Sequence, residues 1–147
     1  MRRRNARVLV VITVGGMLGA VTRHAVSLAV PTARGGLPWS TLIVNVTGCM
    51  LIGVLMVLIL EARQAHPLVR PFIGVGVLGG YTTFSTYAVD AQVLIAEGRP
   101  GLALAYLAGT AAAALVAVQL GVVLTRAVAQ PRPVSRTQRT PSRGGSR

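Results

Sequence analysis

The residues of this chain that could perform chemistry lie mostly inside long apolar stretches. The densest group is a run of glycine, hydroxyl and aromatic residues, GGYTTFSTY, at positions 79–87. Glycine is a poor helix former, and Thr and Ser compete for backbone hydrogen bonds, so this run predicts a break in a helix. At membrane depth a break is tolerated only inside protein or beside water, where its freed carbonyls can bind a cation. The run therefore predicts ion binding, with a hydroxyl-rich packing helix as the simpler alternative.

Asn45 and Asp90 are the other polar groups that could act at membrane depth. Asn45 would share a helical face with Thr41 and Gly48, where an amide either joins two helices or contacts a ligand. Asp90 follows Tyr87 by about one helical turn, near the end of its apolar stretch. An intramembrane role and a position at the aqueous edge both stay open for this acid.

These groups favour the binding of a small anion. Phe84 and Tyr87 are three residues apart and share a helical face, and the edge of an aromatic ring carries positive charge. Ring edges, hydroxyls and an amide could together replace the water around a small anion. Arg23, at the end of another apolar stretch, would raise the local anion concentration. A cation pathway would need rings of acids or carbonyls, which a single acid per chain does not supply.

The residue pattern argues against an enzyme. The two histidines, His24 and His66, lie at the edge of an apolar stretch and in a connection, so they offer no serine–histidine–acid set. The glycine pairs lie within apolar stretches, which excludes a phosphate-binding loop, and Gly15 and Gly19 have the spacing of close helix packing. The single cysteine excludes an intrachain disulfide and a cysteine-based zinc cluster.

Four long apolar stretches predict an all-α membrane protein with four transmembrane helices and a break in the third. Of the 147 residues 52% are hydrophobic and 12% are charged, whereas a soluble domain is about 25% charged. The stretches cover about 8–30, 41–60, 72–96 and 102–124, and a helix needs about 20 residues to cross the hydrocarbon. Continuous apolar runs do not fit the alternating strands of a membrane barrel, and three further stretches argue against a cleaved leader. One transmembrane domain over 8–124 is expected.

Arginine supplies all fifteen basic residues, and its distribution predicts an orientation. Both termini of a four-span chain lie on one side of the membrane. That side holds twelve arginines, in the basic tail 1–7, the connection 61–71 and the tail 125–147, against two or three on the other. The positive-inside rule therefore places both termini of this multi-pass cell-membrane protein in the cytoplasm. The Arg-, Pro- and Ser-rich tail 125–147 is expected to be disordered and to meet lipid headgroups, because it lacks the aromatic residues of a nucleic-acid site.

Three motifs in order resemble those of the small bacterial fluoride channels, the Fluc or CrcB family. The motifs are GGMLGAVTRH at 15–24, TLIVNVTG at 41–48 and GGYTTFSTY at 79–87, and the resemblance covers roughly 8–124. It implies a passive, selective channel that exports toxic fluoride from the cytoplasm. It also implies an antiparallel dimer with two pores, to which both subunits contribute, and a central sodium ion bound by backbone carbonyls.

The resemblance assigns roles to particular residues. It places the sodium-binding carbonyls at Gly79 and Thr82 and the vestibule arginine at Arg23. It places the fluoride pore on residues of three helices: Asn45, Phe84, Ser85, Thr86, Tyr87 and Tyr106. Three positions depart from the family pattern, because Tyr87 stands for a second phenylalanine, Asp90 for a glutamate and His24 for an aromatic residue.

The arginine distribution is a fourth departure. A chain that inserts both ways needs nearly balanced arginines, whereas the bias here is twelve to two or three. We therefore expect insertion in one orientation and pairing with a related, oppositely oriented subunit, while a dimer of this chain with itself stays open. Two other functions fit less well. A small multidrug exporter would need a carboxylate in the first helix, and a non-transporting membrane assembly protein would leave the hydroxyl-rich break unexplained.

Overall fold

The computed structural model of the chain describes residues 2–33, 35–61 and 66–128. All regular structure in these ranges is helical: α1 (Arg2–Ala29), α2 (Trp39–Glu61), the π-helix η1 (Arg70–Leu78), α3 (Gly79–Tyr81), α4 (Ser85–Ala96) and α5 (Pro100–Val128). Three helices are long and apolar enough to cross a membrane, over Asn5–Ala29, Trp39–Ile59 and Pro100–Val128. The remaining expected span, 72–96, is divided among η1, α3 and α4. The chain is therefore an all-helical, multi-pass membrane protein.

The helices run past the predicted ranges at both ends of the described chain. α1 begins at Arg2 rather than at residue 8, and α5 continues to Val128 rather than ending at 124. Hydropathy locates the apolar part of a helix and not its end, and arginine is a good helix former, so helix continues into the charged flanks. Helix therefore occupies most of the predicted tail 1–7 and the first residues of the tail 125–147. The part of that tail beyond residue 128 lies outside the described residues.

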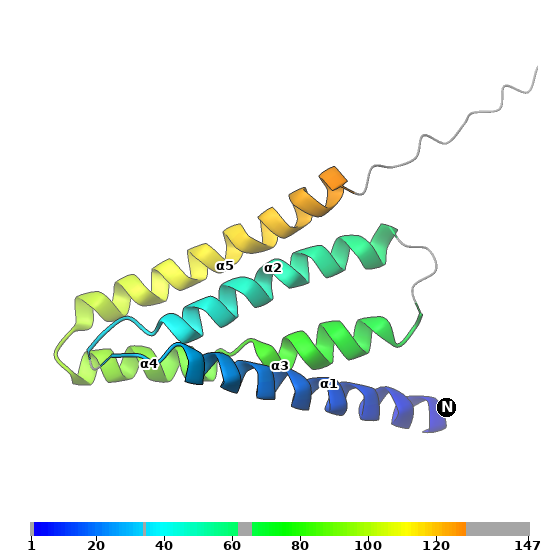
Figure 1. Cartoon of the computed structure of the whole chain (residues 1–147), viewed down its shortest axis with the longest axis horizontal. Helices are drawn as coiled ribbons and strands as arrows, with labels where there is room; N and C mark the ends of the chain where they lie inside the picture. Colours follow the sequence, from blue (N-terminus) through cyan, green and yellow to red (C-terminus); the bar gives the residue numbers. More distant parts are fainter. Residues whose placement is uncertain (1, 34, 62–65, 129–147) are drawn as a thin grey trace, which may run out of the picture.

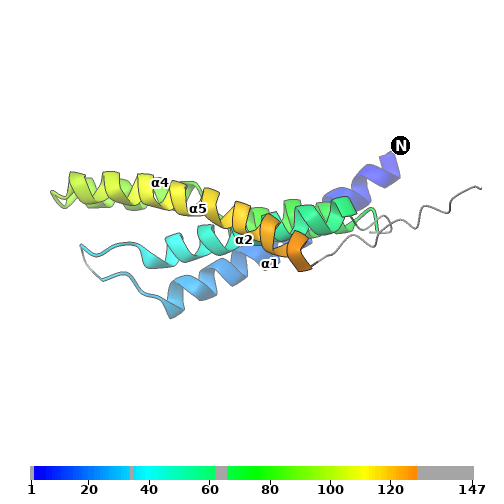
Figure 2. The same ribbon diagram turned by 90° about the horizontal axis from the view of Figure 1, so that it is seen from above.

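The helical segments run up and down along the long axis of the molecule (Figure 1). The start of α1, the ends of α2 and α5 and the start of η1 lie at one end, and the α1–α2 loop and the α4–α5 turn lie at the other. α2 packs mainly on α5, and α1 packs mainly on η1 and α3. Seen from above, the helices spread apart toward the end that carries the α1–α2 loop (Figure 2).

Glycine residues bring pairs of helices into backbone contact. A Cβ on Gly15 would lie 2.6 Å from the Phe72 carbonyl oxygen, and a Cβ on Gly19 would collide with the Val77 carbonyl oxygen. α2 meets α5 in the same way, because a Cβ on Gly53 would collide with the backbone of α5. The packing role predicted for Gly15 and Gly19 is confirmed. Small residues at helix interfaces are the usual means of close approach in membranes.

Replacing Gly19 with alanine is expected to destabilise the fold. The new Cβ would overlap the Val77 carbonyl oxygen and lie 2.7 Å from the Tyr81 nitrogen, and neither backbone group can move alone. Overpacking of this kind costs about 1–3 kcal/mol. Gly109→Ala is the matched control, because a Cβ there meets nothing within 4 Å and alanine favours a helix. Thermal unfolding of the purified protein in detergent checks the pair, and equal midpoints for the two variants would contradict the expectation.

The turn between α4 and α5 has the geometry of a glycine-capped helix end. Gly98 has a φ of 74°, and the Arg99 amide donates to the Leu94 carbonyl at 2.9 Å, as in a Schellman motif. Pro100 then begins α5, where a first-turn residue needs no N–H. The Arg99 guanidinium donates to the Gly35 carbonyl, so the α1–α2 loop is tied to this turn.

The packed core lies between α4 and α5 and fixes the segment that follows the break. Ala91 and Leu94 of α4 pack with Ala103 and Tyr106 of α5. Large apolar side chains on the outer faces stay exposed, such as Leu104 at 68%. Lipid tails are as apolar as these side chains, so a membrane protein of this kind needs no larger core to bury them.

Candidate functional site

The third predicted span is interrupted between α3 and α4. Thr82 is extended, with φ of −73° and ψ of 158°, and helix resumes at Ser85. Asn45 of α2 bridges the interruption, because its Nδ2 donates to Thr83 O and its Oδ1 accepts from Thr83 N, each at 2.9 Å. The predicted break is therefore present. It lies after the two glycines of the run, which are themselves helical.

The break separates several backbone carbonyls, including those of Gly79 and Thr82, from their helical donors. In a continuous helix the Thr83 amide would donate to the Gly79 carbonyl, but here it donates to Asn45. The Thr86 amide would donate to the Thr82 carbonyl, but here it donates to Thr83 Oγ1 at 3.1 Å. Gly79 is exposed, and a Cβ on it would meet nothing within 4 Å. The carbonyls of Gly79 and Thr82, which were predicted to bind sodium, are thus among the carbonyls of the break that have no helical donor.

Three hydroxyl groups form a small network at the start of α4. Thr83 Oγ1 donates to Thr86 Oγ1 at 3.0 Å and lies 3.3 Å from Ser85 Oγ. Ser85 and Thr86 are exposed, so a ligand has access to both side chains. A hydroxyl donates as well as accepts, so this network can present O–H groups to an anion.

The rings of Phe84, Tyr87 and Tyr106 form a row from the surface to the core. Ring centroids are 5.8 Å apart for Phe84 and Tyr87 and 5.4 Å apart for Tyr87 and Tyr106. Phe84 is 80% exposed, whereas Tyr106 is 2% exposed. The Tyr87 hydroxyl donates to the Leu107 carbonyl of α5 at 2.5 Å. The hydroxyl that distinguishes Tyr87 from phenylalanine is therefore bonded to the neighbouring helix, which pins the ring in the row.

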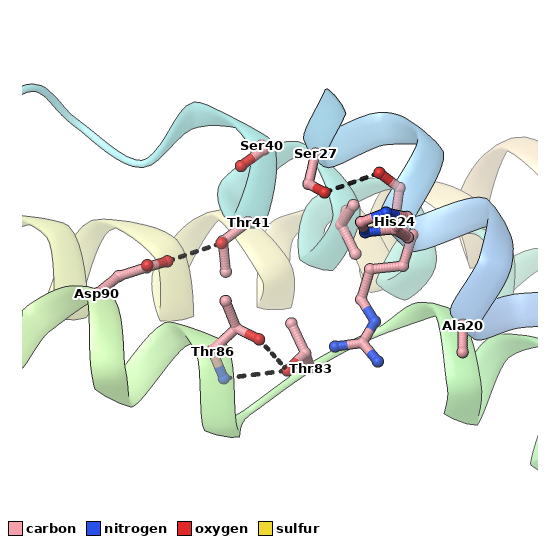
Figure 3. A pocket seen from close by; sticks show the side chains of 10 residues that line it. Ala20, His24, Ser27, Ser40, Thr41, Thr83, Thr86 and Asp90 are labelled. Carbon is pink, nitrogen blue, oxygen red and sulfur yellow. Dashed lines mark hydrogen bonds between the residues drawn. The ribbon is translucent and has the colours of Figure 1, made fainter. Parts of the chain in front are cut away.

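A cavity of about 310 Å³, here called cavity A, lies between α1, α2 and the start of α4. Its lining includes Arg23, His24, Ser27, Thr83, Thr86 and Asp90. Figure 3 shows His24 and Ser27 on the α1 side of this cavity, with Thr83 and Thr86 across from them. Within the part of the chain that the structure describes, Arg23 Nε is buried without a hydrogen-bond partner. The lining of cavity A therefore combines the Arg23 guanidinium, the Asp90 carboxylate and several hydroxyls, and its N–H and O–H groups can contact an anion.

Asp90 joins α4 to the helices on either side of it. Thr41 of α2 donates to Asp90 Oδ2 at 2.7 Å (Figure 3), and Tyr106 of α5 donates to the same oxygen at 3.2 Å. Both hydroxyls are buried, and buried donors need acceptors. A smaller cavity of about 230 Å³ beneath the α1–α2 loop also reaches Asp90. The acid is therefore partly buried between α2, α4 and α5, where it lines both cavity A and this smaller cavity.

A second cavity of about 330 Å³, here called cavity B, lies between α2, the break, α4 and α5. Its lining includes Asn45, Cys49, Phe84, Tyr87 and Thr110. Thr110 is 3% exposed, and among the described residues its hydroxyl is buried without a hydrogen-bond partner. Thr83 lines both cavities, so the broken segment forms the wall between them.

We compared the chain with models of known protein families to test the family relationship that its motifs suggested. The model of the family described as CrcB-like protein, Camphor Resistance (CrcB), matches residues 10–122. The chain belongs to the CrcB family. A relative from Streptomyces coelicolor, named fluoride-specific ion channel FluC 1, is 56% identical over 126 residues, 86% of this chain and 82% of that protein.

Further relatives of this CrcB-family chain carry similar names. A protein of Nocardia farcinica, named fluoride-specific ion channel FluC 2, is 54% identical over 114 residues, 78% of this chain and 81% of that protein. A protein of Rhizobium meliloti, named fluoride-specific ion channel FluC, is 41% identical over 121 residues, 82% of this chain and 97% of that protein. The identity therefore extends across the whole helical domain rather than one motif.

The structure gathers the predicted site residues of this CrcB-family chain around the break. Asn45, Phe84 and Tyr87 line cavity B, and Arg23 and Thr86 line cavity A. The two others predicted for the pore are placed differently. Ser85 lies in the hydroxyl network, and Tyr106 lies behind the aromatic row with its hydroxyl on Asp90.

Three threonines at these cavities were not among the predicted site residues. Thr83 forms the wall between the cavities, Thr41 is bonded to Asp90, and Thr110 lines cavity B. The sequence holds a signal for two of them. Thr41 precedes Asn45 by four residues, and Thr110 is a lone hydroxyl in an alanine-rich part of the fourth stretch.

Proposed function

We propose that this chain is a passive, fluoride-selective ion channel that lets cytoplasmic fluoride leave the cell and so lowers its toxicity. The observation that supports this most strongly is the 56% identity, across 86% of the chain, to a protein named fluoride-specific ion channel. The geometry of the break supports the same function. Two cavities meet at Thr83, and the groups around them are suited to holding a small anion with little fixed charge.

Fluoride enters from cavity A and passes the break into cavity B. Arg23 attracts the anion into cavity A, because its guanidinium is a cation and its Nε–H has no hydrogen-bond partner among the described residues. Asp90 in the same lining opposes permanent binding of the anion, although Thr41 and Tyr106 donate to its carboxylate. At the break the anion exchanges water for the hydroxyls of Ser85 and Thr86 and for Asn45. The Asn45 amide carries two N–H donors, and the Thr83 carbonyl accepts from Nδ2, so one donor is available to a ligand.

The aromatic row provides the next contacts of the anion. The edges of Phe84 and Tyr87 carry positive quadrupole charge, which attracts an anion without trapping it. The bond from the Tyr87 hydroxyl to the Leu107 carbonyl supports this use of the ring, because that hydroxyl is held away from the anion. Tyr106 supports the row from behind and, with Thr41, holds Asp90 in place.

The functional unit is an antiparallel dimer. Phe84 is 80% exposed and Gly79 is open to the surface, so both residues are available for contact with a second subunit. A sodium ion at the centre of the dimer, held by the carbonyls of Gly79 and Thr82, is its structural cofactor. Carbonyl oxygens without helical donors fit this role, because half-helix ends and unwound carbonyls coordinate sodium in membrane proteins. The ion would hold the broken helical segments of the two subunits together.

Both termini lie in the cytoplasm, and the chain inserts in one orientation. A pair of fusions tests this prediction, with a reporter active only in the cytoplasm or only outside it joined to the C-terminus. We expect signal from the cytoplasmic reporter alone. The side of the membrane that holds both termini carries twelve arginines, against two or three on the other side. A variant with the arginines of both tails replaced by glutamine should give mixed signals. Equal signals from the unmodified chain would contradict fixed orientation and favour a dimer of this chain with itself.

Fluoride efflux from liposomes that contain the purified chain tests the function. A fluoride electrode should record rapid release, and chloride-loaded liposomes should release little. If the chain alone is inactive, adding a related subunit of opposite orientation should restore release. Equal release of both anions, or no release in either preparation, would contradict the proposed function.

A further inference from the structure

Cavity B contains the single cysteine of the chain. Cys49 follows Asn45 by four residues on α2, so the two side chains lie on the same face of that helix. The cavity opposite them is lined by Phe84 and Tyr87. A thiol therefore stands beside the amide and the rings to which the proposed function assigns fluoride.

A second observation indicates that this position can hold a ligand. Thr110 of α5 lines the same cavity and is 97% buried, since its exposed fraction is 3%. In the described part of the chain its Oγ1 has no hydrogen-bond partner. A buried hydroxyl without a partner is costly, so a molecule that occupies cavity B and accepts this bond is stabilised there. The cavity of about 330 Å³ is large enough for a group of a few atoms beside the thiol.

We propose that Cys49 is a modification site for small, neutral thiol-exchange reagents, and that the mixed disulfide formed there closes the anion pathway. This proposal rests on the proposed function, because it places cavity B in that pathway. With methyl methanethiosulfonate, the Cys49 sulfur attacks the sulfenyl sulfur and a new S–S bond forms. The bond between that sulfur and the sulfonyl group breaks, methanesulfinate leaves with the electron pair, and the thiol proton passes to solvent.

The reagent must be neutral because the site lies within the apolar span of α2. Trp39–Ile59 is apolar enough to cross a membrane, and Cys49 is near its middle. Moving a charged reagent to this depth requires a large desolvation free energy, whereas a small neutral reagent partitions into hydrocarbon. The added methylthio group replaces water and an accessible Asn45 donor with an apolar surface. Anion occupancy and flux should therefore fall at least about tenfold, the loss expected when one hydrogen bond to a charged group is removed.

The experiment compares fluoride efflux from liposomes before and after treatment with methyl methanethiosulfonate, and counts adducts by intact mass. For each protein, the flux after treatment is compared with the flux of the same protein before treatment. The native chain should gain one adduct and lose flux, and dithiothreitol should restore both. Cys49→Ala should gain no adduct and show no change on treatment. The matched control carries Cys49→Ala and Leu51→Cys, which moves the thiol two residues along α2 to a side chain that is 50% exposed and points nearly the opposite way. It should gain the adduct without losing flux.

The two measurements separate the possible failures. An adduct on the native chain with unchanged flux would overturn the proposal, because Cys49 would then lie outside the pathway. The absence of an adduct would overturn it as well, because cavity B would not admit the reagent. Labelling by the membrane-impermeant trimethylammonium-ethyl reagent as fast as by the neutral one would contradict the assigned depth. No flux before treatment would contradict the proposed function instead, and the adduct count would then decide the accessibility of Cys49 by itself.

Discussion

Asn45→Asp is expected to abolish fluoride flux while leaving the chain nearly isosteric. The substitution keeps an acceptor for the Thr83 amide but removes the donor that serves the Thr83 carbonyl. It also places a negative charge at the break. Two like charges about 4 Å apart repel by about 4 kcal/mol at an effective dielectric constant near 20, which lowers anion occupancy about a thousandfold. Flux through reconstituted protein measures the effect.

Asn45→Ala separates the structural part of this effect from the electrostatic part. Alanine leaves the Thr83 amide and carbonyl without the partners that hold the break open, at a cost of about 1–3 kcal/mol for each group left unsatisfied. We therefore expect the alanine variant to lose more thermal stability than the aspartate variant. If Asn45→Asp still conducts at the native rate, the side chain acts on the backbone alone and does not face the anion.

The sequence predicted the presence of the break because its causes are local. Two glycines followed by two threonines weaken a helix wherever they occur, and the continuous apolar stretches on either side identify the helices. The position of the break within the run was not predictable. Gly79 and Gly80 are helical, and the interruption falls at Thr82, where the backbone has a partner on another helix. That partner is Asn45, which is 38 residues away along the chain, so the contact is set by packing.

Where a residue's role depends on a facing helix, that role also could not be predicted from the sequence. The hydroxyl of Tyr87 is a departure from the family pattern. Its consequence is evident only when α5 is placed beside it, because the Leu107 carbonyl of α5 accepts a hydrogen bond from it. The position of Asp90 stayed open for the same reason, since two donors on α2 and α5 determine that it faces the interior. Hydropathy likewise identified the apolar ranges but not the helix ends, because charged residues extend α1 and α5 without breaking them.

Phe84→Ile is expected to abolish fluoride flux without disturbing the subunit. Isoleucine preserves an apolar side chain but removes the ring edge, and an aliphatic surface offers an anion no compensating positive charge. Because Phe84 is 80% exposed, the fold of one chain gains little from its burial, so thermal stability should change by less than about 0.5 kcal/mol. Flux and unfolding midpoint, measured on one preparation, check both parts of this expectation.

The chain provides a matched control for this substitution, because it has one other phenylalanine. Phe72 lies in η1, away from cavities A and B, so Phe72→Ile should keep its flux. Chemical cross-linking in the membrane should show that both variants assemble as the native chain does. Loss of flux in Phe72→Ile alone would move the pathway away from the break. Loss in both variants with loss of assembly would show that aromatic packing, and not the ring edge, is what the channel requires. Loss in Phe84→Ile alone, with assembly intact, would leave contact between the ring and the anion as the remaining explanation.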